Sequence, residues 1–328
     1  MHDQRAAALM GGSFMRLVLA GAVLAACVSV ADAETQLNMG GSTTSSGFFP
    51  YYSAIANGIS ESDAELNVTV VSPGGFAANS TLIQEGELDF GGMSPDLIAE
   101  AEEAGFDGFR VLWWSLPAIQ NIMATEASGF TTLQDFQGEC FHPGQNGSSQ
   151  QRNMMRILQA LEIQPELYMS DSVDAINAIR NGRCDGQLRA TTAPRLNSAS
   201  AELNITTPLR PIGYTAEEIE TIRAAYPWMG FYEMPAGVTE GSEPYTVHAI
   251  WIGFAATAEM DEDTAYRIVN GMIAGLDSQR TALPAIAEVD ILQQSLEVSE
   301  YPLHAGAVRA YREAGYDVPD RLLPPEMQ

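Results

Sequence analysis

The sequence predicts an α/β fold built from mainly parallel sheets. Strand-like and helix-like segments alternate from about residue 36 to the end of the chain. Three times, a strand-like segment runs into a turn rich in glycine, serine or threonine just before a helix-like segment. No internal repeat or low-complexity tract interrupts this alternation, which is typical of strand–helix–strand units.

The first 33 residues have the pattern of a secretory signal peptide. Arg5 and Arg16 make the start positively charged, and residues 17–30 form an apolar run. Ala31 and Ala33 then form a small-residue cleavage site. The run is too short to span a bilayer. An alternative is the lipobox-like segment at residues 24–27, in which Cys27 would be lipidated. We favour cleavage after Ala33, because hydrophobicity continues past Cys27, and we expect a periplasmic protein.

The chain is strongly acidic. It has 42 acidic and 16 basic residues, a formal charge of −26, and every basic residue is arginine. The leader holds two acids and two bases, so the mature chain keeps this charge. Such a surface argues against nucleic acid and anionic membranes as partners. It also repels an anionic solute at long range, unless a local basic group compensates, and its simplest role is solubility.

The first part of the chain predicts alternating short elements. Strands are indicated by β-branched or apolar alternation, and the helices between them end at glycine or at turn residues. The expected strands are 36–39, 67–72, 88–93, 110–116 and 121–125, and the expected helices are 50–60, 77–85 and 97–104. Pro117 separates the last two strands in this prediction, because proline lacks the N–H group that a ladder needs.

The second part begins with a short helix at 132–136 and a strand at 140–142. The clearest helix is 150–161, which has apolar residues on one face. Ser148 and Gln151 have capping-box spacing at its start. The other expected helices are 172–181, 217–225, 261–277 and 305–314, and the other expected strands are 185–190 and 245–256.

The three turns before helices indicate an anion-binding function. They lie at residues 40–47, 73–75 and 144–149. Backbone N–H groups, hydroxyls and a helix N-terminus converge at such junctions, a setting that suits carboxylate or phosphate. All of these groups are donors, so the solute should be a small organic anion or zwitterion. Phe48, Phe49 and Phe76 predict that the rest of the solute is partly apolar.

These blocks, in this order, resemble the solute receptors of tripartite ATP-independent periplasmic (TRAP) transporters, specifically the TRAP-associated extracytoplasmic immunogenic (TAXI) family. The blocks that carry the resemblance are Thr-Ser-Ser-Gly-Phe-Phe-Pro at 44–50, Pro-Gly-Gly-Phe at 73–76, Gln-Glu-Gly-Glu-Leu-Asp at 84–89, Ser-Pro-Asp at 94–96, Gly-Ser-Ser-Gln at 147–150 and Tyr-Pro-Leu-His-Ala-Gly-Ala at 301–307. No single block is specific, and their shared order over residues 36–316 carries the resemblance. Phe48, Phe49 and Ser94 depart from it, which puts a glutamate-like solute in doubt.

The resemblance implies an α/β type II periplasmic-binding-protein fold, in which two lobes are joined by hinge strands and each is a mainly parallel sheet flanked by helices. On that basis residues 1–33 are the leader, 34–122 and 228–328 form lobe I, and 123–227 form lobe II. The solute would bind between the lobes and pass to the membrane component of a TRAP transporter. The alternative is a periplasmic sensing module that signals to a kinase. We expect a monomer without a cofactor.

The resemblance also implies the residues of the site. The expected ligand-binding residues are Ser42, Thr44, Phe49, Gly74, Gly75, Phe76, Asn79, Ser94 and Asp96 in lobe I, and Ser148, Ser149, Gln150, Arg189 and Thr192 in lobe II. Each has a structural alternative: core packing for Phe49, helix capping for Asn79, Asp96 and Ser148, and a salt bridge with one of the many acids for Arg189.

Two cysteines, Cys140 and Cys184, remain after the predicted cleavage. Export favours a disulfide between them, with two unrelated buried thiols as the alternative. In the implied fold both precede or begin parallel neighbouring strands, so we expect the disulfide. Enzyme functions are disfavoured, because no nucleophile elbow or complete phosphate loop is present and the histidines lack zinc-site spacing.

Overall fold

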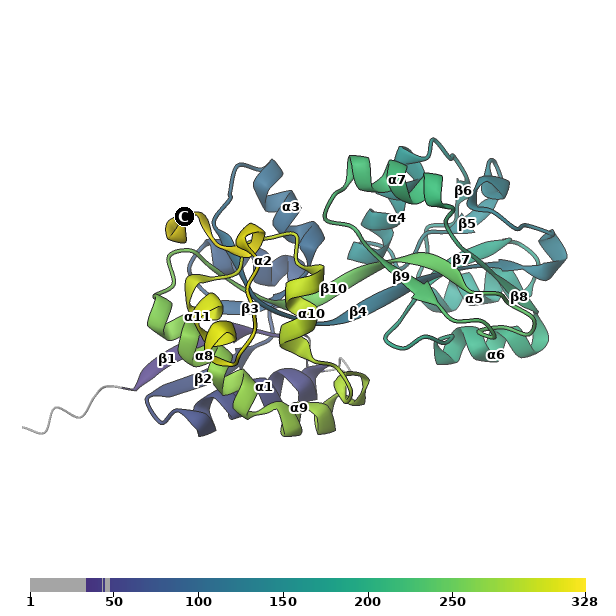
Figure 1. Ribbon diagram of the computed structural model, residues 1–328. Helices are drawn as coiled ribbons and strands as arrows, with labels where there is room; N and C mark the ends of the chain where they lie inside the picture. Colours follow the sequence, from purple (N-terminus) through teal and green to yellow (C-terminus); the bar gives the residue numbers. More distant parts are fainter. Residues whose placement is uncertain (1–33, 43, 45–47) are drawn as a thin grey trace, which may run out of the picture. The chain divides into compact units, whose positions relative to one another are not determined.

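The computed structural model describes residues 34–42, 44 and 48–328. The predicted leader, Thr43 and residues 45–47 lie outside the described residues. The described strands form one mixed sheet in the order β2-β1-β3-β10-β4-β7-β5-β6, with β8 paired to β4 and β9 paired to β10 (Figure 1).

The first elements follow the predicted alternation closely. They are β1 (Thr35–Gly40), α1 (Phe49–Ser62), β2 (Leu66–Val71), α2 (Phe76–Gln84), β3 (Phe90–Met93), α3 (Pro95–Glu103) and β4 (Phe109–Thr125). Short 3-10 turns follow at Glu126–Ser128 and Leu133–Phe136. The predicted helix at 132–136 is therefore a single 3-10 turn, fixed by a capping box between Thr132 and Asp135.

The middle of the chain contains more elements than the sequence predicts. They are β5 (Cys140–His142), α4 (Ser149–Ala160), β6 (Glu166–Leu167), α5 (Ser172–Arg180), β7 (Gly186–Thr191), α6 (Ser198–Thr206), β8 (Leu209–Ile212), α7 (Ala216–Ala225), β9 (Gly230–Met234) and β10 (Tyr245–Thr257). The strands β6, β8 and β9 are short, and α6 has only Ser200 and Leu203 buried, so sequence periodicity did not reveal these elements.

The chain ends in helices. They are α8 (Glu262–Ala274), α9 (Leu276–Ala282), α10 (Ile291–Val298) and α11 (Ala305–Glu313), with 3-10 turns at Pro284–Ile286, Asp320–Leu322 and Pro325–Met327. The predicted helix at 261–277 is thus divided at Gly275, which packs against Gly58 of α1. A Cβ at Gly275 would lie 2.9 Å from the Gly58 Cα, so the close approach of these helices requires glycine.

Two lobes are defined by separate sets of buried side chains. The first lobe has its core around Trp113, Trp114 and Phe254, covered by α1, α3, α8 and α11. The second lobe has cores on both faces of its sheet, one around Phe136 and Phe141 and one beside the disulfide. Met229 and Phe231 pack with the second lobe, although the sequence analysis assigned 228–328 to lobe I.

The long strand β4 passes through both lobes and corrects one sequence prediction. The expected break at Pro117 does not occur, and β4 is continuous over 17 residues. Pro117 lies opposite Trp251 of β10, while β7 joins the other side of β4 only from Ile119 onward. The missing N–H group of Pro117 therefore removes little from the ladder, because one side of the strand has no partner there.

The sheet is mixed, whereas the sequence indicated mainly parallel pairing. The pairs β1–β2, β1–β3, β5–β6 and β5–β7 are parallel, while β4 and β10 pair antiparallel with every neighbour. The chain leaves the first lobe on β4 and returns on β10, so these two strands run in opposite directions. Parallel pairing is thus confined to the outer strands of each lobe.

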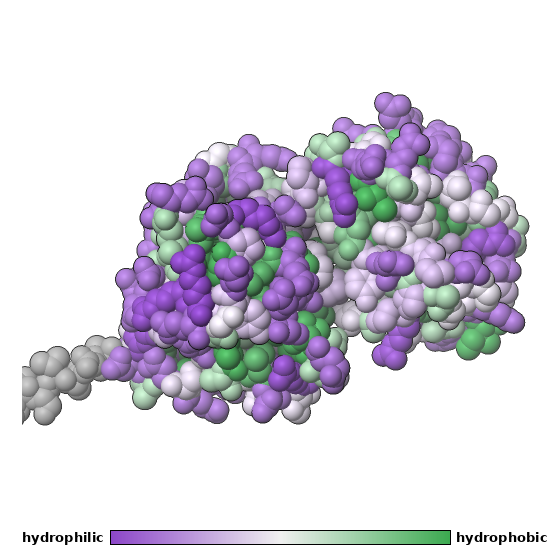
Figure 2. Space-filling model, in the orientation of Figure 1, coloured by the Kyte–Doolittle hydropathy of each residue, from purple (hydrophilic) through white to green (hydrophobic). Residues whose placement is uncertain are grey.

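The predicted disulfide between Cys140 and Cys184 is confirmed, with a Cα–Cα distance of 4.8 Å. It ties the start of β5 to the turn before β7, and these two strands are parallel neighbours as expected. Within the described residues, no helix combines the length and the apolar character that crossing a membrane requires. Hydrophilic residues separate smaller hydrophobic areas on the face shown in Figure 2.

Candidate functional site

The start of α4 carries three of the predicted ligand-binding residues. The Ser148 hydroxyl accepts a hydrogen bond from the Gln151 N–H at 3.2 Å and donates to the Gln145 carbonyl at 2.6 Å. Its predicted alternative role as the N-cap is thus confirmed. The reciprocal capping-box bond is replaced, because Gln151 Oε1 accepts from the Gly147 N–H instead. Gln150 Nε2 donates to Gln120 Oε1 of β4 at 2.9 Å.

The next residue, Ser149, belongs to an ionic cluster that joins the two lobes. Arg152, one turn later, donates from Nη2 to Ser149 Oγ at 2.8 Å and lies 3.4 Å from Asp96 Oδ2 of α3. Glu100 Oε1 of α3 accepts from both Arg152 Nε, at 3.2 Å, and Arg156 Nη2, at 2.9 Å. Within the described residues, every ion pair between the lobes lies here, between α3 and α4.

Asp96 is fully buried in this cluster. Burial raises the pKa of its carboxyl group, and the positive charge of Arg152 opposes that effect. Its Oδ1 has no hydrogen-bond partner among the described residues. Ser94, also fully buried, is the N-cap residue of α3, so both residues of the predicted Ser-Pro-Asp block lie at the helix start.

The junction before α2 keeps its backbone donors available. Gly74 and Gly75 have φ angles of 122° and 134°, a region that glycine alone adopts readily. Neither N–H group makes a hydrogen bond within the described residues. Asn79 is different: it is fully buried, and its Nδ2 lies 3.0–3.3 Å from the carbonyls of Gly40, Gly41 and Gly92. Its amide donors thus hold the ends of β1 and β3 together.

The remaining lobe I residues are less buried. Ser42 is half-buried just beyond β1, and Thr44 is exposed. Phe49 begins α1 and is half-buried, and its carbonyl accepts from Ser53 Oγ. Phe76 begins α2 and packs against the core of the first lobe.

Arg189 lies in β7 and is half-buried. The salt bridge given as its structural alternative is not found: its guanidinium has no ion pair and no side-chain hydrogen bond with any described residue. Burial lowers its pKa from the usual value, although arginine remains charged at neutral pH. The pKa of His142 is lowered, mainly by burial and to a smaller extent by the charge of Arg189.

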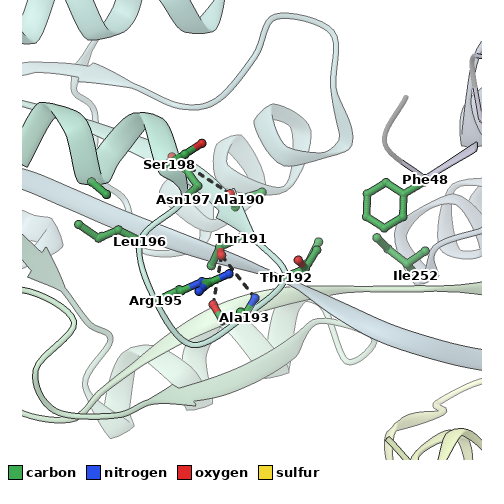
Figure 3. Close-up of a pocket in the computed structure, with 12 residues that line it drawn as sticks. Phe48, Ala190, Thr191, Thr192, Ala193, Arg195, Leu196, Asn197, Ser198 and Ile252 are labelled. Atoms are coloured by element: carbon green, nitrogen blue, oxygen red, sulfur yellow. Dashed lines mark hydrogen bonds between the residues drawn. The ribbon is translucent and has the colours of Figure 1, made fainter. Parts of the chain in front are cut away.

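A cavity of about 650 Å³ opens beyond the end of β7. It is lined by Phe48, Ala118, Ile252 and a run of residues between 190 and 201 that includes the predicted Thr192 (Figure 3). Figure 3 shows Phe48 and Ile252 facing this run from the other side of the cavity. Thr191 Oγ1 donates to the Ala193 carbonyl, and Asn197 Nδ2 donates to the Ala190 carbonyl, so the run is held to the strand end.

Sequence reasoning missed three arginines of this region. Arg152 and Arg156 are four residues apart on α4 and meet Asp96 and Glu100, which are four residues apart on α3. This matched spacing places each pair on one helix face, and the sequence shows it. The sequence does not show which two helices meet. Arg195, which lines the cavity, lies three residues after the predicted ligand-binding residue Thr192, so its position in the sequence was a signal for it.

The three histidines that the structure describes have local structural roles. His142 Nδ1 lies 2.9 Å from the Tyr168 carbonyl, His248 Nδ1 lies 2.9 Å from the Tyr214 hydroxyl, and His304 caps α11. Within the described part of the chain, no group of three or more His, Cys, Asp or Glu residues could hold a metal ion.

A family model described as NMT1-like matches residues 39–315. The chain belongs to the NMT1-like family. This membership covers both lobes and the strands between them. The TAXI subfamily that the sequence resembles is a finer assignment than this match provides.

Several solved structures are similar to this chain at low identity. A TctC solute-binding protein from Polaromonas is 12% identical, with a TM-score of 0.50 over 76% of this chain and 87% of that one. The periplasmic aliphatic sulphonate-binding protein SsuA from Escherichia coli is 14% identical, with a TM-score of 0.47 over 85% and 82% of the two chains. A TRAP periplasmic solute-binding protein from Ochrobactrum anthropi is 14% identical, with a TM-score of 0.47 over 90% and 85%.

Proposed function

We propose that this chain is an extracytoplasmic receptor that binds a small organic anion or zwitterion and delivers it to the membrane component of a TRAP-type transporter. Family membership, the two-lobed fold and the expected signal peptide support a receptor. The solute is bound without chemical change, because the histidines and buried carboxylates of the site serve local structure.

The observation that best supports an anionic solute is that Arg189 has no partner among the described residues. A chain with a net charge of −26 offers many carboxylates, and the other partly buried arginines have one, except Arg210, which donates to the Phe130 carbonyl instead. Arg110 pairs with Glu326, Arg156 with Glu100, and Arg267 with Asp63. Arg189 has none among the described residues, although removing a guanidinium from water is costly without an anionic partner. A bound solute would supply that partner.

The surroundings of Arg189 also favour an external anion. Asn121 of β4 lies opposite Arg189 in the antiparallel register, and its side chain is held by the Tyr245 hydroxyl at 2.9 Å. Asn121 Nδ2 also points to the Arg195 carbonyl at 3.5 Å, which brings the backbone of a second unpaired arginine to the same place. Arg189 and Arg195, six residues apart around the end of β7, add local positive charge to an otherwise acidic chain.

Backbone donors of the first lobe complete the proposed site. The free N–H groups of Gly74 and Gly75 suit a carboxylate oxygen. We propose as further contacts Ser42, Thr44, Phe49, Phe76, Ser94, Asp96, Ser148, Ser149, Gln150 and Thr192. Asn79 supports the site through its carbonyl contacts with the ends of β1 and β3.

The test begins with mass spectrometry of the solute retained by protein purified from its natural host. Calorimetry then compares the wild type with Arg189→Ala and with Arg183→Ala, an exposed arginine in the turn before β7. Losing a charge-assisted hydrogen bond should weaken binding roughly 10- to 100-fold for Arg189→Ala and should leave the control unchanged. Equal affinity in all three proteins would refute the anion site.

Delivery to the transporter is tested separately. Proteoliposomes that contain the TRAP membrane component should take up the labelled solute only when the receptor is added. Uptake that is independent of the receptor would contradict the delivery role and leave solute binding intact.

A further inference from the structure

We infer that the cavity beyond β7 binds an amphipathic monoanion, an aryl-substituted or branched aliphatic carboxylate or sulfonate, with its acidic group at Arg195 and its apolar body between Phe48 and Ile252. This inference rests on the proposed receptor function and names the class of solute. It places the acidic group at Arg195, which lines the cavity, and not at Arg189, which does not line it. The sequence analysis singled out two residues of this cavity, Thr192 as a ligand contact and Phe48 as an apolar residue near the solute, but it did not assign Arg195 or Ile252.

The charge of its lining residues distinguishes this cavity from the others and favours an anionic solute. Among the described residues, Arg195 is the only charged one that lines it, and none of the lining residues is acidic. Four other cavities in the described part of the chain each have at least one acidic lining residue, such as Glu288 and Asp290 in one of them. In a chain of net charge −26, a cavity free of carboxylates with one arginine is the place where an organic anion meets the least repulsion.

The guanidinium of Arg195 is available to a solute. Its side chain is exposed and makes no ion pair or hydrogen bond with any described residue. Its backbone is fixed, because its N–H donates to the Ala193 carbonyl and its carbonyl lies 3.5 Å from Asn121 Nδ2. The guanidinium therefore belongs to a segment whose backbone is fixed. A carboxylate or sulfonate can accept hydrogen bonds from two of the guanidinium N–H groups.

The rest of the lining is mostly apolar. It comprises Phe48, Ala118, Ala190, Ala193, Leu196, Ala201 and Ile252, with hydroxyl or amide groups at Thr191, Thr192, Asn197 and Ser198. Two of these polar side chains are already used, since Thr191 bonds Ala193 and Asn197 caps α6. A sugar-like solute would leave many hydroxyls unpaired against such walls, whereas an aromatic ring or branched chain gains from burial.

The size of the cavity agrees with this class. At about 650 Å³ it falls in the range typical of small-molecule sites, and it exceeds what acetate or a similarly short acid would fill. A single arginine provides one anionic contact, so a dianion would carry a second charge into apolar surroundings. The expected solute has one acidic group and an apolar part.

The experiment uses the mature protein and a defined set of probes: phenylacetate, 4-methylpentanoate and benzenesulfonate, the neutral phenylacetamide, and the comparison anions acetate and glutarate. Calorimetry should show at least one of the first three binding tenfold or more tightly than phenylacetamide, acetate and glutarate. Arg195→Ala should remove the preference for phenylacetate over phenylacetamide, a readout that a merely structural role would not move.

A variant that fills the cavity tests whether the solute binds there. Ala201→Trp places a large side chain into the lining from an exposed position of α6 and should weaken binding of the preferred probe at least tenfold. The matched control is Ile205→Trp on the same helix, at a residue that is 82% exposed and does not line the cavity. Circular dichroism checks that both variants fold.

The outcomes separate this inference from the proposed function. If the retained solute binds through Arg189 but Ala201→Trp binds it as tightly as the wild type, the receptor stands and the cavity inference is wrong. If glutarate or a sugar acid binds best, the amphipathic class is wrong. If no organic anion binds at all, both proposals fail.

Discussion

The Arg152 guanidinium of α4 lies 3.4 Å from the Asp96 carboxylate of α3, and this ion pair joins the two lobes. The partners differ in exposure: the Asp96 side chain is fully buried, while the Arg152 side chain is 32% exposed. Removing one member therefore has different consequences from removing the other.

We expect Arg152→Ala to lower the free energy of unfolding by roughly 1–3 kcal/mol, because it leaves the buried Asp96 carboxylate without its cation. Asp96→Asn should change that free energy by less than about 1 kcal/mol, since the amide avoids the cost of burying a charge. Urea denaturation of both variants, with the exposed Arg180→Ala as control, measures the difference. Equal losses in both variants would contradict this account.

Asp96 should also give a definite pH dependence. Its pKa is raised above 3.8 in the folded state, so the folded protein binds the proton more tightly than the unfolded chain. Stability therefore falls as pH rises from 3.8 through the folded-state pKa. The stability difference between Asp96→Asn and the wild type should grow in favour of the variant over that range. Melting temperatures measured between pH 3.5 and about 7 test the sign.

His248 should make the folded protein less stable as pH falls, the opposite of the Asp96 effect. It is fully buried beside Tyr214, and burial lowers its pKa from 6.5 to about 3. Between these values the unfolded chain binds more protons, so stability is lost as pH falls below 6.5. His248→Gln should reduce the slope of unfolding free energy against pH by at most about 1.4 kcal/mol per pH unit. An unchanged slope in chemical denaturation would count against a neutral buried histidine.

The disulfide should stabilise the second lobe. Cys140 and Cys184 are separated by 44 residues, and a crosslink of that span contributes about 4 kcal/mol at most. The variant with serine at both positions should unfold at lower urea concentration, and reducing agent should shift the wild type alone. Thiol labelling of unreduced, unfolded wild type should find no free cysteine; labelling at both positions would disprove the bridge.

We expect the mature protein to begin at Glu34, because Ala31 and Ala33 follow the apolar run at 17–30. The intact mass of protein from its natural host checks this. A diacylated species beginning at Cys27 would show that the lipobox alternative is correct.

Much of the fold was predictable because it depends on local patterns. Helix α4 follows from its apolar face and its Ser148 cap, and both were found as expected. Pro117 was misleading, because the cost of proline in a strand depends on whether a neighbour needs its N–H group. That neighbour is determined by tertiary structure. The short elements β8 and β9 are stabilised by β4 and β10, and they have little signal of their own.

The candidate site was predictable only in part. Arg189 was identified from its unusual place in a strand, but its lack of a carboxylate partner required the structure. Asn79 was identified as a polar residue of the site region, yet its donors hold three carbonyls that are distant in sequence. The pairing of Asp96 with Arg152 depends on two helices from different lobes, which no local pattern specifies.

The strands β4 and β10 pair with each other from Phe109 and Thr257 to Ile119 and Ala249. Pro117 has no amide proton, and β10 shows register irregularities at Ile252/Gly253 and Phe254/Ala255, where the strand enters the core of the first lobe. If the lobes rotate when a solute binds, these strands absorb the deformation, and the amides of Trp251 to Ala255 change their rate of exchange with deuterated water. Hydrogen exchange at this one segment of β10 would thus report solute binding in the unlabelled protein, before the solute itself is identified.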